Sequence, residues 1–313
     1  MAHDIDHIIN HISLRKSRGR WRWIAILLVV AGLAVLLLRM GGDGLPDKDH
    51  IARLRIDGLI TGDQASLDLL REVAKDDKVR AVILRIDSPG GTTAGSEALY
   101  EEIRALSARK PVVAVMDTVA ASGGYIAAIA ADHIVARGNT ITGSIGVIFS
   151  FPEVSRLLDT VGVTMEEIKS GELKAEPSPY KPVSDKARAY TATLVQDGFQ
   201  WFKGLVAERR KLAPARVDVL SDGRVFSGRQ ARAEGLIDEL GGETAAQAWL
   251  TGVKKLDAGL EIIDRKPPQP VAERLLGMSI GSAVLDGLGL GGMARMAERA
   301  KLDGLLVLWH PAP

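Results

Sequence analysis

The stretch Ala81-Val-Ile-Leu-Arg-Ile-Asp-Ser-Pro-Gly-Gly91 decides the fold, because an apolar run ends there in a turn marked by proline and glycine. A helical pattern follows over residues 94–108, and a second apolar run, residues 111–116, follows that helix. Apolar runs without polar alternation are typical of strands buried on both faces, and strands that alternate with helices form largely parallel sheets. The sequence therefore predicts an α/β fold.

The same alternation extends in both directions from this stretch. We expect further strands at residues 51–56, 133–136, 142–148 and 163–168, and further helices at residues 66–74, 125–131 and 185–212. Residues 223–242 carry a compact strand–helix–strand pattern. A chain of 313 residues can hold one large domain or two small ones.

Composition excludes several classes of site. The 40 Lys and Arg residues nearly balance the 39 Asp and Glu residues, so a body that binds nucleic acid is not indicated. Cysteine is absent, which excludes disulfides, a thiolate nucleophile and a thiolate metal site. An exported domain of this chain must therefore be held together by its core.

The N-terminal region predicts a membrane anchor. A basic cluster at residues 15–22 precedes the apolar run 24–38, and Trp21 to Met40 spans about 20 residues, or roughly 30 Å of helix. A cleaved signal peptide is the rival interpretation, but it would end in a small-residue cleavage site, whereas this run ends in Arg39-Met-Gly-Gly-Asp43. An uncleaved transmembrane helix over residues 21–40 is the better prediction.

The anchor divides the chain into segments. The excess of basic residues on its N-terminal side places residues 1–20 in the cytoplasm and the rest of the chain outside it. Residues 41–50 read as a linker, residues 51–266 as the α/β domain, and residues 267–313 as a loosely ordered tail with little clear periodicity.

A candidate nucleophile lies in the turn Ala121-Ser-Gly-Gly-Tyr125, which joins an apolar strand to a helix of small residues. At such a junction the hydroxyl of Ser122 is presented beside the amide of Gly123, as in the nucleophile turns of other hydrolases. The alternative is a serine that only caps the helix, a common role at this position. Sequence alone leaves both interpretations open.

Two further glycine turns accompany the serine turn. Ser88-Pro-Gly-Gly91 allows backbone amides to approach a ligand closely, as an oxyanion hole requires. An ordinary turn between a strand and a helix can have the same sequence, so this alternative stays open. Thr142-Gly-Ser-Ile-Gly146 offers the hydroxyl of Ser144, which can hydrogen-bond a neutral amine and orient it.

A serine hydroxyl needs a neighbouring base, and no histidine is well placed to be one. Of the six histidines, His133 follows the helix after the serine and is best interpreted as structural. A lysine held neutral by burial is the alternative base. Lys174, in the glycine- and proline-marked loop 170–179, is the candidate, and Lys169 and Lys181 are rivals that spacing alone does not separate.

Taken together in their order, these motifs resemble the bacterial signal peptide peptidase A family. The motifs are Asp87-Ser-Pro-Gly-Gly91, Ala121-Ser-Gly-Gly-Tyr125, Thr142-Gly-Ser-Ile-Gly-Val147, Lys169-Ser-Gly-Glu-Leu-Lys174, and Gly223-Arg-Val-Phe-Ser-Gly-Arg-Gln-Ala231 with Gly235-Leu-Ile-Asp238. The resemblance covers residues 51–242, and the anchor and length are similar to those of the short, single-domain form.

The resemblance implies a membrane-anchored serine endopeptidase with a Ser/Lys dyad, in which Ser122 is the nucleophile and Lys174 the general base. Ser144 would orient the lysine, and the amides of Gly91 and Gly123 would form the oxyanion hole. The family's fold is a Clp- and crotonase-like spiral of ββα units. The resemblance also implies no cofactor or metal, a ring-like homo-oligomer, and substrates that are released signal peptides and similar apolar peptides, cleaved on the periplasmic or extracytoplasmic side of the bacterial inner membrane.

Three alternatives remain beside this hypothesis. The first is a related Ser/Lys peptidase that acts on a membrane-protein partner. The second is a crotonase-like acyl-thioester enzyme, for which the sequence lacks a suitably placed pair of glutamates. The third is a non-catalytic scaffold of the same fold.

Overall fold

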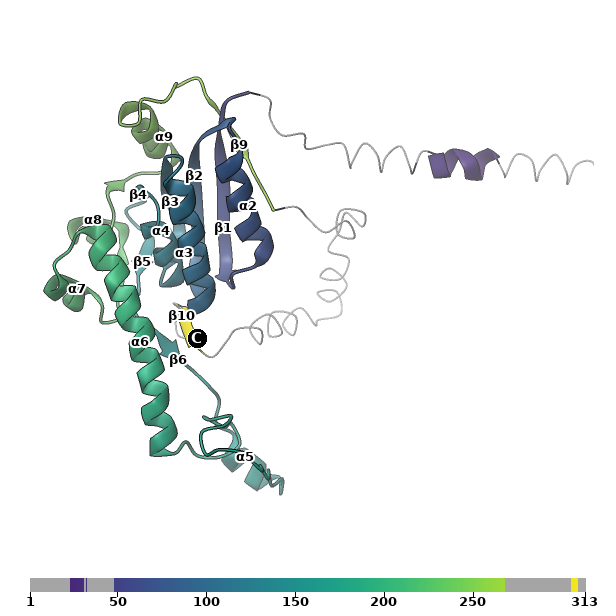
Figure 1. The fold of residues 1–313 in the computed structure, drawn as a ribbon, viewed down its shortest axis with the longest axis vertical. Helices are drawn as coiled ribbons and strands as arrows, with labels where there is room; N and C mark the ends of the chain where they lie inside the picture. Colours follow the sequence, from purple (N-terminus) through teal and green to yellow (C-terminus); the bar gives the residue numbers. More distant parts are fainter. Residues whose placement is uncertain (1–22, 31, 33–47, 268–304, 309–313) are drawn as a thin grey trace, which may run out of the picture. The chain divides into compact units, whose positions relative to one another are not determined.

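In a computed structural model of the chain, residues 23–30, 32, 48–267 and 305–308 are described. They belong to two compact units, of which the second begins at Lys48 and contains the α/β body (Figure 1). In the first unit, residues 23–30 are helical, and the rest of the predicted anchor at 21–40 lies almost wholly outside the described residues. Within the described ranges, we find no helix with the length and apolar character that a membrane crossing requires.

The body is built on a ten-stranded sheet whose centre is parallel. β2 (Val79–Thr92) pairs in parallel with β1 (His50–Ile60) on one side and with β3 (Val112–Ala121) on the other. The remaining strands of the described sheet are β4 (His133–Ala136), β5 (Ile141–Gly143), β6 (Ile148–Phe149), β7 (Val225–Ser227), β8 (Glu239–Leu240), β9 (Glu261–Asp264) and β10 (Leu305–Leu308). The predicted α/β fold is confirmed.

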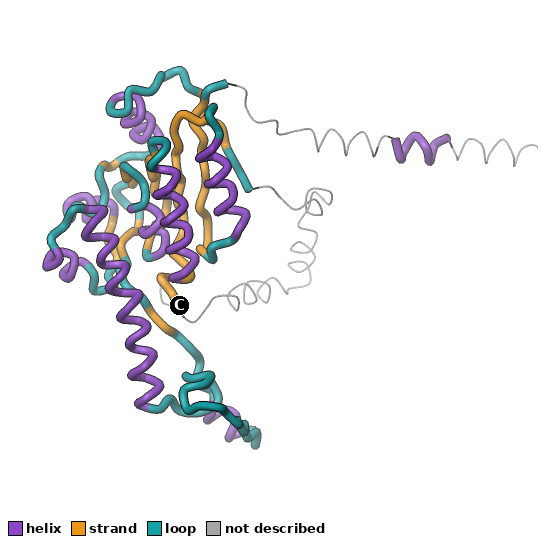
Figure 2. Tube along the Cα trace, in the orientation of Figure 1, coloured by secondary structure: helices purple, strands orange, loops and turns teal. Residues whose placement is uncertain are grey.

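Helices cover both faces of this sheet (Figure 2). α2 (Gln64–Lys75), α3 (Thr93–Ser107) and α4 (Gly123–Ile129) share one apolar core with the sheet, and α9 (Glu243–Gly252) shares a second core with the opposite face. The other helices of the body are α5 (Ser155–Thr160), α6 (Asp185–Arg210), α7 (Pro214–Leu220) and α8 (Gly228–Ala233).

The two cores explain why the central strands read as continuous apolar runs. Successive side chains of a strand point to opposite faces of the sheet. In β2, Val82 and Leu84 accordingly lie in the first core, whereas Ala81 and Ile83 lie in the second, and all four are buried. Since neither face of β2 meets water over this length, no polar alternation is required.

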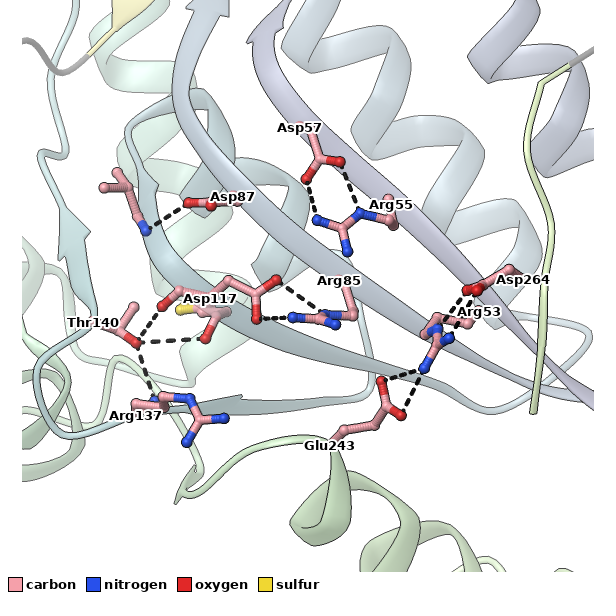
Figure 3. A network of polar contacts seen from close by, with 12 residues as sticks. Arg53, Arg55, Asp57, Arg85, Asp87, Asp117, Arg137, Thr140, Glu243 and Asp264 are labelled. Carbon is pink, nitrogen blue, oxygen red and sulfur yellow. Dashed lines mark hydrogen bonds and ion pairs between the residues drawn. The ribbon is translucent and has the colours of Figure 1, made fainter. Parts of the chain in front are cut away.

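On the face covered by α9, ion pairs tie the outer elements to the central strands (Figure 3). Arg53 of β1 donates to Glu243 of α9 at 2.9 Å and to Asp264 of β9 at 2.8 Å. Arg85 of β2 donates to Asp117 of β3 at 3.0 Å. These contacts link β1 to α9 and β9, and β2 to β3, on this face of the sheet.

Two predicted strands are wrong. Residues 163–168 have no regular secondary structure, and their apolar side chains Val163 and Met165 are exposed rather than paired with a neighbouring strand. The predicted strand at residues 142–148 is two short strands, β5 and β6, because Ser144 adopts a left-handed conformation with φ of 50° and leaves the extended backbone. Helix α5 was not expected from the sequence.

One short strand is described within the predicted tail. Leu305–Leu308 forms β10, which pairs antiparallel with Gly90–Thr92 of β2 and with β6. The remainder of residues 267–313 lies almost entirely outside the described residues. Four apolar residues of the predicted tail therefore extend the main sheet at the C-terminal end of β2.

Candidate active site

Ser122 lies in a strained turn between β3 and α4. Its φ is 54° and its ψ is −116°, a conformation that a residue with a side chain adopts only when the surrounding structure imposes it. Its side chain caps no amide of α4, so the capping role does not apply. The hydroxyl is buried and has no hydrogen-bond partner among the described residues. A sharp, strained turn from strand to helix is where other hydrolases hold their nucleophile, and the Ser122 hydroxyl has no partner in the described chain that would give it a structural role.

Pairing of β3 with β5 brings Ser144 beside this turn. Ala121 pairs with Gly143 in the parallel register, and the amide of Ser122 donates to the carbonyl of Gly143 at 2.8 Å. Ser144 follows immediately, with 8% of its surface exposed, and its own amide donates to the carbonyl of Arg224 at 2.8 Å. The two predicted serines therefore lie at the same end of neighbouring strands.

The start of α4 packs directly on the turn at Ser88. A Cβ atom on Gly124 would lie 2.5 Å from the carbonyl oxygen of Ser88, so a side chain at this position would force the two segments apart. Ser88 is itself fixed, since its hydroxyl donates to the carbonyl of Gly58 at 2.6 Å and accepts the amide of Gly90 at 3.1 Å. The glycine of the motif therefore lets the nucleophile turn and the Ser88 turn touch.

A carboxylate bridges the irregular step between these strands. The pairing of β2 with β3 shifts in register between Ile86 and Ser88, and at this step the amide of Val119 donates to the carboxylate of Asp87 at 3.0 Å (Figure 3). The Asp87 carboxylate thus takes the place of a backbone carbonyl as the acceptor for the amide of Val119, which lies three residues before Ser122. The motif that contains Asp87 predicts no separate role for it, because spacing along the sequence does not reveal a contact between two strands.

Gly91 lies in a strand rather than in the expected turn. β2 runs on to Thr92, and Gly91 pairs with Ile60 of β1 on one side and with Val307 of β10 on the other. A Cβ atom on Gly91 would lie 1.8 Å from the carbonyl oxygen of Ile60, which explains why glycine is needed there. Gly91 and Gly123 are consequently held near the same end of β2 and β3.

Helix α4 is anchored both in its first turn and at its C-terminal end. The buried hydroxyl of Tyr125 donates to the carbonyl of Leu236 at 2.8 Å, and burial raises the pKa of this tyrosine. Arg209 of α6 donates to the carbonyls of Ile129 and Ala131 at 2.8 and 3.0 Å. A guanidinium at the C-terminal carbonyls is favoured by the helix dipole.

Lys174 is not brought to the serine within the described chain. It is exposed, its side chain makes no hydrogen bond or ion pair with another described residue, and it lies in a turn where its amide donates to the carbonyl of Gly171 at 3.1 Å. Lys174 belongs to residues 161–184, which connect α5 to α6. In Figure 1, this connection lies beyond the N-terminal end of α6, away from α4. Of the predicted site, Ser122, Gly123, Ser144 and Gly91 are gathered, and Lys174 stands apart.

The two rival lysines are both engaged by carboxylates. Lys169 contacts Glu167 at 2.8 Å and Glu176 at 2.9 Å, and Lys181 contacts the same two carboxylates at 3.3 and 2.5 Å. The hydrogen bonds that Lys169 donates to Glu167 and Glu176 raise its pKa, which is the wrong direction for a general base. Among the three candidate lysines, Lys174 is the one without an anionic partner in the described chain.

The remaining polar side chains that could take part in chemistry are dispersed. In the part of the chain that the structure describes, no group of three or more His, Cys, Asp or Glu side chains is arranged to hold a metal ion. His133 stacks on Trp249 at 4.8 Å between ring centroids and lies 3.2 Å from Glu239, so it has the structural surroundings predicted for it.

Comparison with known proteins identifies the class. The family described as Peptidase family S49 matches residues 104–257. A putative protease of Synechocystis is 38% identical over 247 residues, which cover 78% of this chain and 89% of that protein. A putative signal peptide peptidase SppA of Enterococcus faecium is 35% identical over 194 residues, covering 62% of this chain and 56% of that protein.

These matches define a peptidase. The chain belongs to peptidase family S49, and the resemblance drawn from the five motifs is confirmed. Among solved structures, the chain is similar to a mutant of the 1510-N membrane-bound stomatin-specific protease, with 16% identity and a TM-score of 0.44, over 71% of this chain and all of that one.

Proposed function

We propose that the chain is a serine endopeptidase in which Ser122 is the nucleophile and Lys174 the general base. The neutral amine of Lys174 accepts the proton of the Ser122 hydroxyl as its oxygen attacks a peptide carbonyl. The amides of Gly91 and Gly123 stabilise the resulting oxyanion, and Ser144 orients the lysine. The lysine then protonates the leaving amine, and water hydrolyses the acyl-enzyme.

The strained geometry of Ser122 is the observation that carries this proposal. A structural serine at a helix start would relax into a capping conformation and bond an amide of the first turn. Ser122 does neither, and its buried hydroxyl has no partner among the described residues. The Gly143 carbonyl and close packing at Gly124 maintain the backbone strain, and strain of this kind clusters at functional sites.

Lys174 needs a covering partner before it can act as a base. An exposed lysine is protonated at neutral pH, whereas burial lowers its pKa. Along residues 148–194 many large apolar side chains are exposed, which marks a surface that another protein covers. They are Ile148, Leu157, Val161, Val163, Met165, Ile168, Tyr180, Tyr190 and Leu194. We propose that a second copy of the chain covers this surface in a ring-like homo-oligomer and thereby buries Lys174.

The pairing of β10 supports an extended peptide as substrate. The segment Leu305-Leu-Val-Leu308 adds antiparallel to Gly90–Thr92, so this edge accepts an apolar strand beside the proposed oxyanion amide of Gly91. Strand addition supplies backbone hydrogen bonds that do not depend on sequence, while side-chain pockets select apolar residues. Released signal peptides are extended and apolar, and they are the substrate class we propose.

The proposed setting is the bacterial inner membrane. The expected anchor over residues 21–40 would hold the chain in the bilayer, with the catalytic domain on the periplasmic or extracytoplasmic side. Fusion of a reporter enzyme to the chain after Asp47, active only outside the cytoplasm, tests this arrangement. An inactive reporter would contradict it.

Alanine variants test the dyad. We expect Ser122→Ala to abolish both labelling by a fluorophosphonate probe and hydrolysis of an apolar peptide, and Lys174→Ala to lower kcat by about 10⁴-fold or more. Lys75→Ala, an exposed lysine in the last turn of α2, is the control and should keep full activity. Normal turnover by Lys174→Ala would contradict the proposal.

A mixing experiment tests the role of assembly. If the amine reaches the serine of a neighbouring copy, mixed oligomers of Ser122→Ala and Lys174→Ala will regain part of the activity that each variant lacks. If the mixture stays inactive, the dyad is completed within one copy. A related peptidase that acts on a membrane-protein partner would favour membrane-protein tails over free signal peptides in the same assay.

A further inference from the structure

Four charged side chains form a closed cluster at the base of the loop that carries Lys174. Each of the carboxylates Glu167 and Glu176 lies within 3.3 Å of both ammonium groups, those of Lys169 and Lys181. The side chain of Glu176 is 5% exposed and also accepts the amide of Ser178 at 3.2 Å. Two positive and two negative charges are therefore balanced within one site.

This ion cluster brackets Lys174 in the sequence and in space. Lys169 and Glu176, which lie on either side of Lys174, are joined at 2.9 Å and close the loop. Within the loop, the amide of Glu176 donates to the carbonyl of Leu173 at 3.3 Å, and Ala175 adopts a left-handed conformation with φ of 58°. A short, closed loop of this kind fixes the direction in which its tip is presented.

We propose that Glu167, Lys169, Glu176 and Lys181 are positioning residues, which hold the Lys174 loop closed and keep both carboxylates occupied so that neither pairs with the Lys174 amine. The inference rests on the proposed role of Lys174 as the base. It assigns no catalytic step to the cluster itself.

The physical reason lies in the effect of an anion on a base. A carboxylate within a few ångströms of an ammonium stabilises its charged form and raises its pKa, which lowers the fraction of neutral amine. Glu176 is two residues from Lys174, within reach of its flexible side chain. Because Lys169 and Lys181 hold Glu176, and lower its pKa to about 2, this carboxylate is permanently charged yet unavailable to Lys174.

The other charged groups of the segment do not replace the cluster. Glu172, two residues before Lys174, is 70% exposed and forms an ion pair with Lys186. Glu166 is exposed in the irregular segment before the loop, and Asp185 is the first residue of α6. Glu172 thus offers a matched control, since it lies at the same distance along the chain from Lys174 but in solvent.

The test is the pH dependence of kcat/KM for hydrolysis of an apolar peptide by the full-length protein. The acid limb of this profile reports the pKa of the base in the free enzyme. Lys169→Met removes one of the two cations that hold the carboxylates, so that a carboxylate can interact with the Lys174 amine. We therefore expect the midpoint of the acid limb to rise by about 1 pH unit. In the double variant Lys169→Met/Glu176→Gln the freed carboxylate is gone, and we expect the midpoint to return toward that of the wild type.

The return in the double variant separates positioning through charge from a purely structural role. If the cluster only stabilised the fold, removing a second member would not restore the midpoint. Glu172→Gln should leave the profile unchanged. An unmoved midpoint in Lys169→Met, or a double variant that is shifted as much as the single one, would overturn the inference.

Two further measurements keep the outcomes distinct. If Lys169→Met does not fold, as judged by circular dichroism, Lys181→Met serves instead, since Lys181 is 46% exposed and contacts the same carboxylates. If Lys174→Ala keeps its activity, the proposed function fails. If Lys174→Ala is inactive and the midpoints do not move, the dyad stands and only the role of the cluster is rejected.

Discussion

The amide of Ser122 donates to the carbonyl of Gly143 at 2.8 Å, and this bond joins the strained serine to the end of β5. The bond comes directly after the last pair of the β3–β5 ladder, Ala121 with Gly143. The chain must then turn sharply into α4, and Ser122 takes up the turn with a φ of 54°. Sheet register, rather than any side-chain contact, imposes the conformation of the proposed nucleophile.

Ser122→Gly should stabilise the fold relative to Ser122→Ala while both variants are inactive. Glycine adopts a positive φ without steric cost, whereas alanine retains the strain of the turn. We expect Ser122→Gly to be more stable by about 1–2 kcal/mol, measured as the free energy of unfolding in urea. Equal stability of the two variants would show that the turn stores no strain.

Gly124→Ala should lower both stability and activity. The added Cβ would lie 2.5 Å from the backbone oxygen of Ser88, so the first turn of α4 must move away. We expect a loss of about 1–3 kcal/mol in the free energy of unfolding and a fall in kcat. In Gly204→Ala, within α6, the added atom has nothing within 4 Å, and stability should rise by up to about 1 kcal/mol.

Local patterns were sufficient to predict the central sheet and the serine. β2 and β3 are buried on both faces over most of their length, so their composition alone marks them as strands. Ser122 is marked by glycines that the packing requires, and Gly124 shows why one of them is needed. In such regions the local sequence and the tertiary structure impose the same constraint.

Other features depend on contacts between distant residues, which spacing does not reveal. β10 reaches Gly91 from more than 200 positions along the chain, and its apolar tetrapeptide has no periodicity of its own. Residues 163–168 alternate like a strand but find no partner strand within the described chain. The carboxylate partners of Lys169 and Lys181 are likewise contacts that spacing does not reveal, and the assignment of Lys174 as the base stays a prediction.

Removal of β10 should increase the affinity for peptide substrates. β10 pairs with the edge at Gly90–Thr92 at which we expect the substrate strand to add, so the two compete for the same backbone groups. A variant that ends at Gly304 should show a lower KM for an apolar peptide, with kcat unchanged. A variant that lacks only residues 309–313 keeps β10 and serves as the control. If the longer deletion raises KM instead, β10 contributes to the binding site rather than competing for it.

Arg210→Met should destabilise the fold in a pH-dependent way. Arg210 contacts Asp238 at 2.7 Å, and Asp238 also accepts the amide of Ile134 at 2.8 Å. Burial alone would raise the pKa of Asp238, but the hydrogen bond and charge of Arg210 outweigh it and lower the pKa below its ordinary value. The pair therefore contributes stability above the ordinary carboxyl pKa of about 3.9, and this contribution is lost as the pH falls through the lower, folded value.

In the variant, Asp238 is left partly buried without its cation, and we expect a loss of about 3 kcal/mol in the free energy of unfolding at pH 7. Because the uncompensated carboxylate can be neutralised by a proton, the difference from the wild type should shrink between pH 5 and 3. Urea unfolding of both proteins at four pH values measures this difference in the free energy of unfolding. Arg216→Met, which breaks an exposed ion pair with Glu234, should cost less than about 1 kcal/mol at every pH. A difference for Arg210→Met that stays constant with pH would mean that packing of the guanidinium, and not its charge, stabilises the end of α6.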